Sequence, residues 1–308
     1  MDEFELIDKL KKKIPVSRYA AIGIGDDAAV LKRFGPGNLG ISTDMLVENV
    51  DFVLNKLSPE KIGRKALAVN LSDLAAMGAE PLAFVLAIGK PKHVSVRWIE
   101  RFYDGLLKLA KQYKIDCVGG DFSSAKEFSV SVTILGRTGR VVPRSGAKPG
   151  DWIGVTGSLG GSILKKHYDF TPRIREGKFL SRKGFVNSMI DVSDGLYQDL
   201  QHILRASGVA AEVKLERIPI SKDAVKLSRG NKRAVLERAL TDGEDFELLF
   251  TAPAKVKEKI EKAWHREFSK IPLFWIGKIV KGKPDIQWSL AGKKIRMGKL
   301  LQKGFKHF

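Results

Sequence analysis

Two adjacent carboxylates, Asp26 and Asp27, lie between glycines and small apolar residues in the stretch 23–31. No lysine, arginine or histidine occurs in residues 20–31, so the local sequence offers these acids no base. An unpaired carboxylate beside apolar residues is costly unless it is hydrated, protonated or bound to a cation. The stretch therefore raises the question of what neutralises its charge.

Six windows of the chain share this character, and together they contain 16 of its 35 acidic residues but none of its 54 lysines and arginines. They are residues 20–31, 41–52, 66–89, 115–125, 189–201 and 241–254. Taken singly, each aspartate could be a helix cap or a turn residue. Six of them, however, lie at expected element ends or beside small residues: Asp27, Asp44, Asp73, Asp121, Asp191 and Asp194. Mg²⁺ prefers carboxylates together with substrate phosphates, so the windows predict magnesium that carries a polyphosphate.

Other motifs for anions or metals are missing or fit poorly. The first stretch matches Gly-x-Gly-x-x-Ala, but no helical periodicity follows it, and Asp26 and Asp27 would repel a pyrophosphate. No Gly-x₄-Gly-Lys-Ser/Thr motif occurs. Residues 157–162 could expose backbone N–H groups to an anion, but a plain turn is the favoured interpretation. The five histidines are far apart and lack close-spaced partners, so no zinc site is expected.

Alternating strands and helices are expected to position the carboxylates. Apolar runs and alternation predict strands at residues 20–24, 28–34, 39–43, 81–88, 115–118, 128–136, 152–156, 187–191, 210–215, 246–251 and 273–279. Ser58 and Pro59 predict the start of a helix that Gly78 ends. Further helices are expected at residues 1–15, after 157–162, and at 95–113, 195–207 and 255–268. Each half is therefore predicted to be an α/β sandwich or an α+β layer structure.

The length of 308 residues predicts two domains. The turn-rich segment 143–150 is the best boundary, which gives domains of residues 1–142 and 143–308. The single cysteine, Cys117, excludes a disulfide framework and is expected to be a small buried hydrophobe.

The net charge of +19 raises the possibility of a nucleic-acid partner. The bases are dispersed through residues 9–13, 165–183 and the last third, which is more typical of a solvated surface, and a positive field would equally attract anionic metabolites. No apolar run approaches the roughly 20 residues of a membrane helix, and the N-terminus does not resemble a signal peptide. We expect a soluble cytoplasmic protein without a membrane or nucleic-acid partner.

Eight segments in chain order resemble the thiamine-monophosphate kinase family: GIGDDAAVL, ISTDMLVENVDF, KALAVNLSDLAAMGAEP, VGGDFSS, RSGAKPGDWIGVTG, MIDVSDGLYQDL, ALTDGEDFELLF and GFKHF. Of these segments, NLSDLAAMGAEP and IDVSDGL are the most characteristic of that family. The family belongs to the superfamily of aminoimidazole-ribonucleotide synthetase. The resemblance implies a two-domain α/β (α+β) fold and a homodimer, in which the N-terminal sheet domain joins the subunits and ATP is bound partly across their interface.

The resemblance also implies roles for individual residues. Mg²⁺ ligands would be Asp27, Ser42, Thr43, Asp44, Asp73, Asp121, Asp191 and Asp194. ATP contacts would come from Tyr103, Gly120, Asp121, Arg144 and Ser193, and thiamine-phosphate contacts from Asp51, Glu244 and Phe305.

The implied reaction converts ATP and thiamine monophosphate to ADP and thiamine diphosphate. The acceptor phosphate has a second pKa of about 6 and is largely ionised at neutral pH, so no side-chain base or nucleophile is expected. Several Mg²⁺ ions would cancel the repulsion between the substrates and allow direct in-line transfer. Three alternatives stay open: another ATP-dependent synthetase of the superfamily, a metal-binding regulatory module, and a basic nucleic-acid-binding protein.

Overall fold

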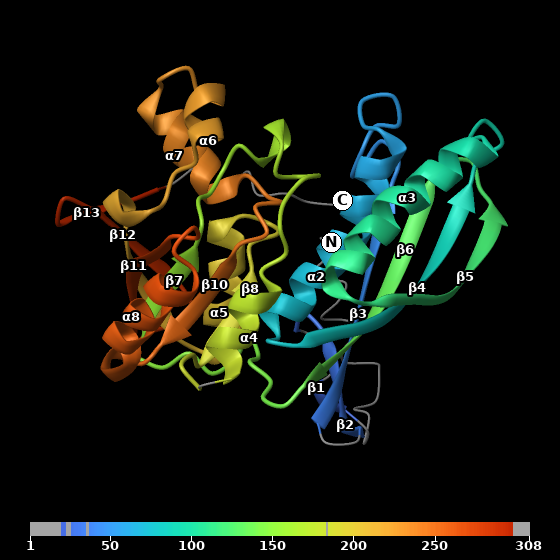
Figure 1. Ribbon diagram of the computed structural model, residues 1–308. Coiled ribbons are helices and arrows are strands. Elements are labelled where there is room, and N and C mark those ends of the chain that lie inside the picture. Colours follow the sequence, from blue (N-terminus) through green and yellow to red (C-terminus); the bar gives the residue numbers. More distant parts are fainter. Residues whose placement is uncertain (1–19, 23–25, 35–36, 183, 298–308) are drawn as a thin grey trace.

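The computed structural model describes residues 20–22, 26–34, 37–182 and 184–297 (Figure 1). The first half of this part forms a six-stranded sheet in the order β1-β2-β3-β6-β4-β5. Its strands are β1 (Ala20–Ile22), β2 (Ala29–Phe34), β3 (Gly37–Val47), β4 (Glu80–Lys90), β5 (Asp116–Ser124) and β6 (Ser129–Thr138). All pairs are antiparallel except β4 with β5.

The two faces of this sheet differ in burial. Asp44, Val132, Leu86 and Gly120 form one row across β3, β6, β4 and β5. The side chains of Val132 and Leu86 in this row are buried beneath helices, whereas residues of the next row, such as Met45, are exposed. Because strand side chains alternate between faces, the first row belongs to the helix-covered face and the next to an open outer face.

Helices α2 (Pro59–Ala76) and α3 (Val96–Tyr113) cover the buried face. Pro59 follows the extended Ser58 at the start of α2, as predicted, and Ser95 caps α3 by accepting from the Trp98 amide at 3.2 Å. The helices approach closely at two glycines, because a Cβ on Gly63 or Gly105 would lie only 1.9 Å from a backbone oxygen of the other helix. The crossing therefore fixes α2 against the sheet.

The second half forms a seven-stranded sheet in the order β13-β12-β9-β11-β7-β10-β8. Its strands are β7 (Trp152–Thr156), β8 (Ser188–Asp191), β9 (Ala210–Lys214), β10 (Leu248–Ala252), β11 (Leu273–Val280), β12 (Ile286–Leu290) and β13 (Lys293–Ile295). Its helices are α4 (Ile174–Arg182), α5 (Leu196–Ser207), α6 (Lys222–Leu227), α7 (Lys232–Thr241) and α8 (Lys257–Glu267), with short 3₁₀ turns at Ser162–Leu164, Leu215–Arg217 and Ala254–Val256.

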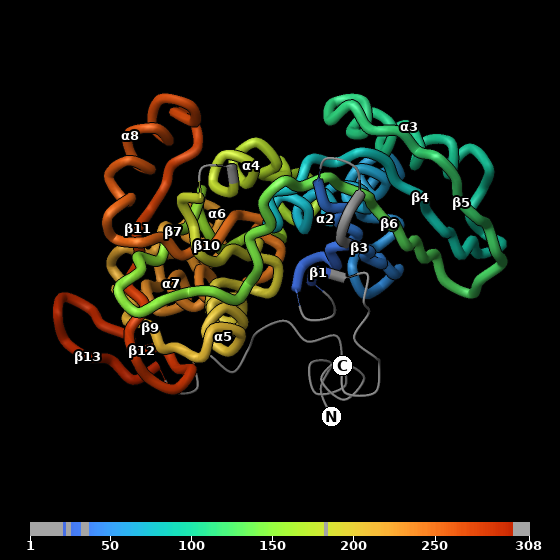
Figure 2. The backbone as a smooth tube through the Cα atoms, turned by 90° about the horizontal axis from the view of Figure 1, so that it is seen from below, coloured from blue at the N-terminus to red at the C-terminus, as the bar shows by residue number. Residues whose placement is uncertain are grey.

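Helix α2 lies between the two sheets, and Figure 2 shows the same arrangement from below. One continuous apolar core includes Leu74 of α2, Ile134 of the first sheet and Phe250 of the second. A second core lies on the other face of the second sheet, where Ile190 packs with Leu200 of α5. The second half is thus an α/β sandwich, and α2 joins it to the first sheet.

The structure confirms the mixed α/β (α+β) architecture and most of the expected elements, but two expectations were wrong. β5 does not end at Val118: it continues to Ser124 because it pairs with β4 as far as Lys90. Only a single 3₁₀ turn, Ser162–Leu164, follows residues 157–162 directly, and the next α-helix begins at Ile174. The expected helix at residues 1–15 lies outside the described residues. In the part of the chain that is described, no helix is long and apolar enough to span a bilayer.

Candidate active site

Three aspartates from separate parts of the chain meet between the two sheets. Asp27 precedes β2, Asp73 lies in the last turn of α2, and Asp191 ends β8. One carboxylate oxygen from each lies within 4.8 Å of the others. The structure therefore brings together Asp27, Asp73 and Asp191 as the sequence predicted.

Serine hydroxyls hold two of these carboxylates. Ser42 donates to Asp73 and also to the Asp27 carbonyl oxygen at 3.2 Å, while Ser72 donates to Asp191 at 2.6 Å. Asp44 lies beside the same group, and its backbone amide donates to the Asn70 side chain at 3.1 Å. Ser42 and Asp44 reach the group because both project from the helix-covered face of β3.

Burial and mutual repulsion shift the pKa values of these carboxyls upwards. Burial, together with the charge of Asp27, raises the pKa of Asp44 to about 6 and that of Asp191 to about 8. Burial and the charges of Asp44 and Asp191 raise the pKa of Asp73 well above its usual value. The ionised carboxylates therefore repel one another, and a bound cation would offset this repulsion.

Arg144 corrects the expectation that the acids have no basic neighbours. Its guanidinium Nη2 donates to Asp27 Oδ1 at 2.6 Å, and its backbone amide donates to Asp26 at 3.0 Å. The base comes from 117 residues away, so a count of local lysines and arginines missed it. Within the described residues, neither Asp27 Oδ2 nor Arg144 Nε has a hydrogen-bond partner, although both atoms are buried. Both atoms are therefore unsatisfied polar groups within the carboxylate region.

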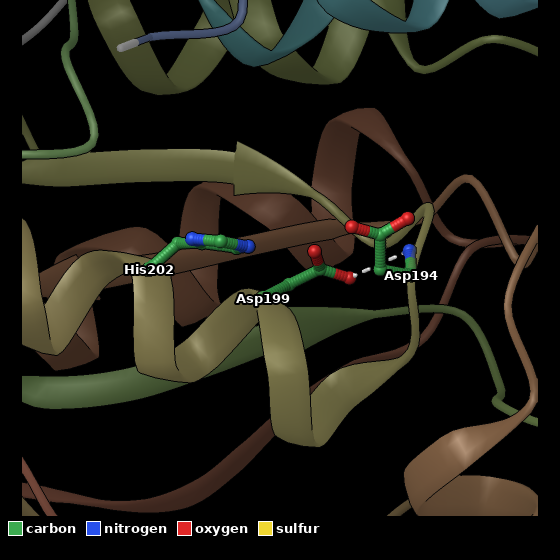
Figure 3. Close-up of side chains that lie close together, drawn as sticks. All are labelled: Asp194, Asp199 and His202. Carbon is green, nitrogen blue, oxygen red and sulfur yellow. Dashed lines mark hydrogen bonds between the residues drawn. The ribbon is translucent and has the colours of Figure 1, made fainter. Parts of the chain in front are cut away.

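A second group contains Asp194, Asp199 and His202 (Figure 3). Asp199 and His202 lie on successive turns of α5, and Asp199 accepts a hydrogen bond from the Asp194 amide at 3.1 Å. This contradicts the expectation that the histidines lack close-spaced partners. The i, i+3 spacing of Asp199 and His202 on a predicted helix would have revealed the pair.

Other predicted ligands lie elsewhere in the single chain. The Thr43 hydroxyl is on the outer face of the first sheet, where it donates to the Val132 carbonyl at 3.1 Å and bonds to Thr133 at 3.0 Å. Asp121 is on the same face, and Gly120 is on edge strand β5 near Tyr103 of α3. Three strand spacings separate β5 from β3, or about 14 Å. One chain therefore does not bring Thr43, Gly120, Asp121 or Tyr103 to the carboxylate group.

A cavity of about 860 Å³ adjoins this region. Asp51 and Glu244 both line it, as do His167 and Tyr168. The Glu244 amide donates to the Ser193 carbonyl at 2.7 Å, which joins a predicted thiamine-side residue to a predicted ATP-side residue. Phe305, the third residue expected on this side, lies outside the described residues.

One ion pair in the cavity wall escaped the sequence analysis. Lys65 of α2 donates to Glu244 at 2.5 Å, and Lys65 directly precedes the window 66–89, which has no lysine or arginine. Burial raises the pKa of Glu244, and the adjacent Lys65 opposes that rise. Burial and the charge of Lys65 lower the pKa of His167 to about 4, so this imidazole is neutral near pH 7.

The donor set fits a divalent cation that prefers oxygen ligands. The Asp27, Asp73 and Asp191 carboxylates converge, and the Asp27 Oδ2 atom needs a partner. In the described part of the chain, no lysine or arginine forms an ion pair with Asp44, Asp73 or Asp191. This chemistry matches Mg²⁺ or a similar ion rather than a soft metal.

Comparisons with known proteins agree with this picture. Residues 25–138 match the family described as AIR synthase related protein, N-terminal domain. The chain is 37% identical to the thiamine-monophosphate kinase of Rhodopirellula baltica over 93% of this chain and 91% of that protein. It is also 37% identical to that of Escherichia coli strain K12 over 99% of this chain and 98% of that protein. A solved structure described as AaThiL complexed with AMPPCP and TMP superposes with a TM-score of 0.83 at 32% identity, covering 100% of this chain and 97% of that one.

Proposed function

This chain belongs to the thiamine-monophosphate kinase family, and we propose that it converts ATP and thiamine monophosphate to ADP and thiamine diphosphate. The observation that carries the proposal is the convergence of Asp27, Asp73 and Asp191 beside the cavity lined by Asp51 and Glu244. A carboxylate group suited to Mg²⁺ and a pocket with an acidic wall are what a metal–nucleotide and an acceptor with a cationic thiazolium ring require.

Asp27, Asp73 and Asp191 would hold Mg²⁺, with Ser42 and Asp44 beside them. The bound ions would neutralise phosphate charge and stabilise the charge that develops on the transferred group. Ser42 and Ser72 orient the carboxylates through the hydrogen bonds that they donate. We further propose Asp194 as a ligand at the second group, since its carboxylate lies with Asp199 and His202 on the same side of the second sheet.

Arg144 would bind ATP phosphate, as the sequence predicts. Its Nη2 is engaged by Asp27, but the Arg144 side chain is 22% exposed, so an anion can reach the guanidinium. Ser193 would lie near the nucleotide, because its carbonyl fixes the Glu244 amide at the boundary between the two sites. The two substrates would then meet between β8 and the start of α5.

The acceptor is already a nucleophile, because its phosphate is largely ionised at neutral pH. The reaction therefore needs positioning and charge neutralisation but no side-chain base. We propose direct in-line transfer without a phosphorylated enzyme. Isolation of a hydroxylamine-sensitive aspartyl phosphate after incubation with ATP alone would contradict this step.

The cavity would hold the thiamine moiety. Glu244 could accept from the aminopyrimidine or lie opposite the thiazolium charge, and Asp51 also lines the cavity. Tyr168 offers an aromatic face to a ring or a cation, and Lys61 already lies 4.4 Å from its centroid. Phe305 stays a predicted contact from the C-terminal segment.

A homodimer would explain why the predicted ATP-binding residues lie apart from one another in a single chain. The outer face of the first sheet carries exposed apolar side chains, including Met45 (56% exposed), Val85 (40%) and Val118 (63%). Such an uncovered apolar sheet face is typical of an interaction surface. Thr43 and Asp121 lie on this face, so a second copy packed against it would place a partner's surface next to them. We propose that ATP is bound partly across this interface, next to Asp121, and extends around edge strand β5 to Gly120 and Tyr103 on the helix-covered side.

We place the enzyme in the cytoplasm, because both of its substrates carry phosphate charges that do not cross a bilayer unaided. ADP release in a coupled assay with thiamine monophosphate, with and without Mg²⁺, tests the function directly. Turnover only with an aminoimidazole precursor would instead indicate a synthetase of the superfamily. Binding to nucleic acid that weakens steeply with salt and does not depend on Mg-ATP would instead indicate a basic nucleic-acid-binding protein.

A further inference from the structure

The Lys65 ammonium is buried without contact to solvent. Its side chain is 0% exposed, and it is among the largest fully buried side chains of the described chain. A lysine is rarely buried to this extent unless its charge is paired. Lys65 is paired twice: its Nζ donates to Glu244 Oε1 at 2.5 Å and to the Asp51 carbonyl oxygen at 2.9 Å.

These two bonds connect the two walls of the cavity. Asp51 belongs to the turn after β3, where its carboxylate accepts from the Val47 amide at 2.7 Å. Glu244 precedes β10 and has a φ of 62°, a left-handed backbone conformation that is unfavourable for a glutamate. A buried cation that binds both segments can hold Glu244 in this conformation. Lys65 therefore fixes one wall against the other.

The ion pair also determines which Glu244 oxygen remains for a ligand. Lys65 takes Oε1, while Oε2 lies 3.9 Å from His167 Nδ1 in the wall of the cavity. The Glu244 side chain is 34% exposed, so a ligand in the cavity can reach it. Lys65 itself cannot touch that ligand, because its side chain has no accessible surface.

We propose that Lys65 is a positioning residue for the thiamine moiety: it orients Glu244 so that Oε2 faces the bound aminopyrimidine or thiazolium ring. The inference rests on the proposed function, since it concerns the acceptor site of that reaction. A direct role is excluded by burial, and a cation would in any case repel the thiazolium charge. Lys65 should therefore affect recognition of thiamine monophosphate and leave recognition of ATP unchanged.

The test uses the full-length chain and steady-state kinetics for both substrates. The variants are Lys65→Met, Glu244→Gln and the double variant Lys65→Met/Glu244→Gln. We expect each single variant to raise the KM for thiamine monophosphate about 10- to 100-fold, the range for one lost charge-assisted contact. The KM for ATP should change less than about twofold, the scatter of such measurements.

The double variant distinguishes positioning from a general structural role. If Lys65 acts only through the Glu244 carboxylate, removing it from the Glu244→Gln background should change the KM for thiamine monophosphate less than about threefold. This comparison also works if Lys65→Met alone does not fold, because the double variant leaves no buried unpaired charge. Lys257→Met is the matched control, since Lys257 forms a 2.6 Å pair with Glu261 away from the cavity and should leave both KM values unchanged.

Two results would overturn the proposal. One is an equal rise in the KM values for ATP and thiamine monophosphate in Lys65→Met. The other is a multiplicative loss in the double variant, which would mean that Lys65 acts independently of Glu244. If the unmodified enzyme releases no ADP with thiamine monophosphate, the proposed function fails instead. The wild-type assay therefore separates the two failures.

Discussion

Neutralising Asp73 should stabilise the metal-free protein while removing its response to Mg²⁺. Asp73, Asp27 and Asp191 present oxygens within 4.8 Å of one another. Two ionised carboxylates at that separation repel by about 3 kcal/mol at an effective dielectric constant of about 20. Loss of the hydrogen bond from Ser42 to Asp73 would lower the free energy of unfolding by about 1 kcal/mol and so offset part of this gain. For Asp73→Asn in EDTA at pH 8, we therefore expect the free energy of unfolding to rise by about 2 kcal/mol.

The pH dependence follows from the raised pKa values. Asp44 titrates at about 6 and Asp191 at about 8 in the folded protein, both above the ordinary value of 3.8. Groups with raised folded pKa values bind protons more tightly in the folded state, so the contribution of Asp44 and Asp191 to metal-free stability is highest below about pH 4 and falls as the pH rises towards 8. The advantage of Asp73→Asn should therefore be large at pH 8 and small at pH 5.

In Mg²⁺ the wild type should be more stable than Asp73→Asn, the opposite of the order expected in EDTA. At ten times its dissociation constant, each bound ion adds about 1.4 kcal/mol to wild-type stability, and several ions add more. Asp73→Asn should gain little from Mg²⁺ and should show no activity. Chemical denaturation at pH 5 and pH 8, in EDTA and in MgCl₂, measures all of these differences.

Asp151→Asn is the matched control for this experiment. Asp151 is also buried, but it accepts from the Lys148 amide at 2.9 Å and the Asn187 side chain at 2.8 Å, away from the carboxylate group. Its substitution should lower stability equally with and without Mg²⁺. The reasoning is refuted if Asp73→Asn behaves like this control, because Asp73 would then be a structural hydrogen-bond acceptor.

Three further substitutions test other parts of the site. Arg144→Ala should raise the KM for ATP at least 10-fold, the effect of one lost charged phosphate contact, and an unchanged KM would remove Arg144 from the nucleotide site. Val85→Asp should convert a dimer to monomers by placing a charge on the outer sheet face, as measured by sedimentation; a monomeric wild type would contradict the interface. Asp121→Asn should abolish activity without changing the fold, and full activity would exclude Asp121 as a ligand.

The sequence predicted those parts of the site that depend on local pattern. Asp27, Asp73 and Asp191 each lie beside small residues at an element end, and the alternation in β3 places Ser42 and Asp44 on the same face. Such patterns can be read from neighbouring residues alone. Most strands and helices were predictable for the same reason, because their apolar periods are short and their boundaries carry Gly, Pro or Ser.

Long-range pairing could not be predicted in this way. Arg144 reaches Asp27 across 117 residues, and Lys65 reaches Glu244 across 179, so no window of neighbouring sequence contains either pair. The length of β5 likewise depends on its pairing with β4 rather than on its own composition, which includes two glycines and two serines. The Asp199 and His202 pair differs from these, because its i, i+3 spacing on a predicted helix can be read from neighbouring residues.

Helix α2 has one consequence for how this enzyme can evolve. Lys65 and Ser72 are seven residues apart, which is two turns, so they project from the same side of the helix with a separation of about 10 Å along its axis. Lys65 holds Glu244 in the proposed acceptor pocket, and Ser72 holds Asp191 in the proposed metal-binding group. One rigid helix would thus set the distance between the proposed donor and acceptor sites. Insertion of a single residue between them would rotate one end by about 100° and misalign the two substrates, even if each site remained intact.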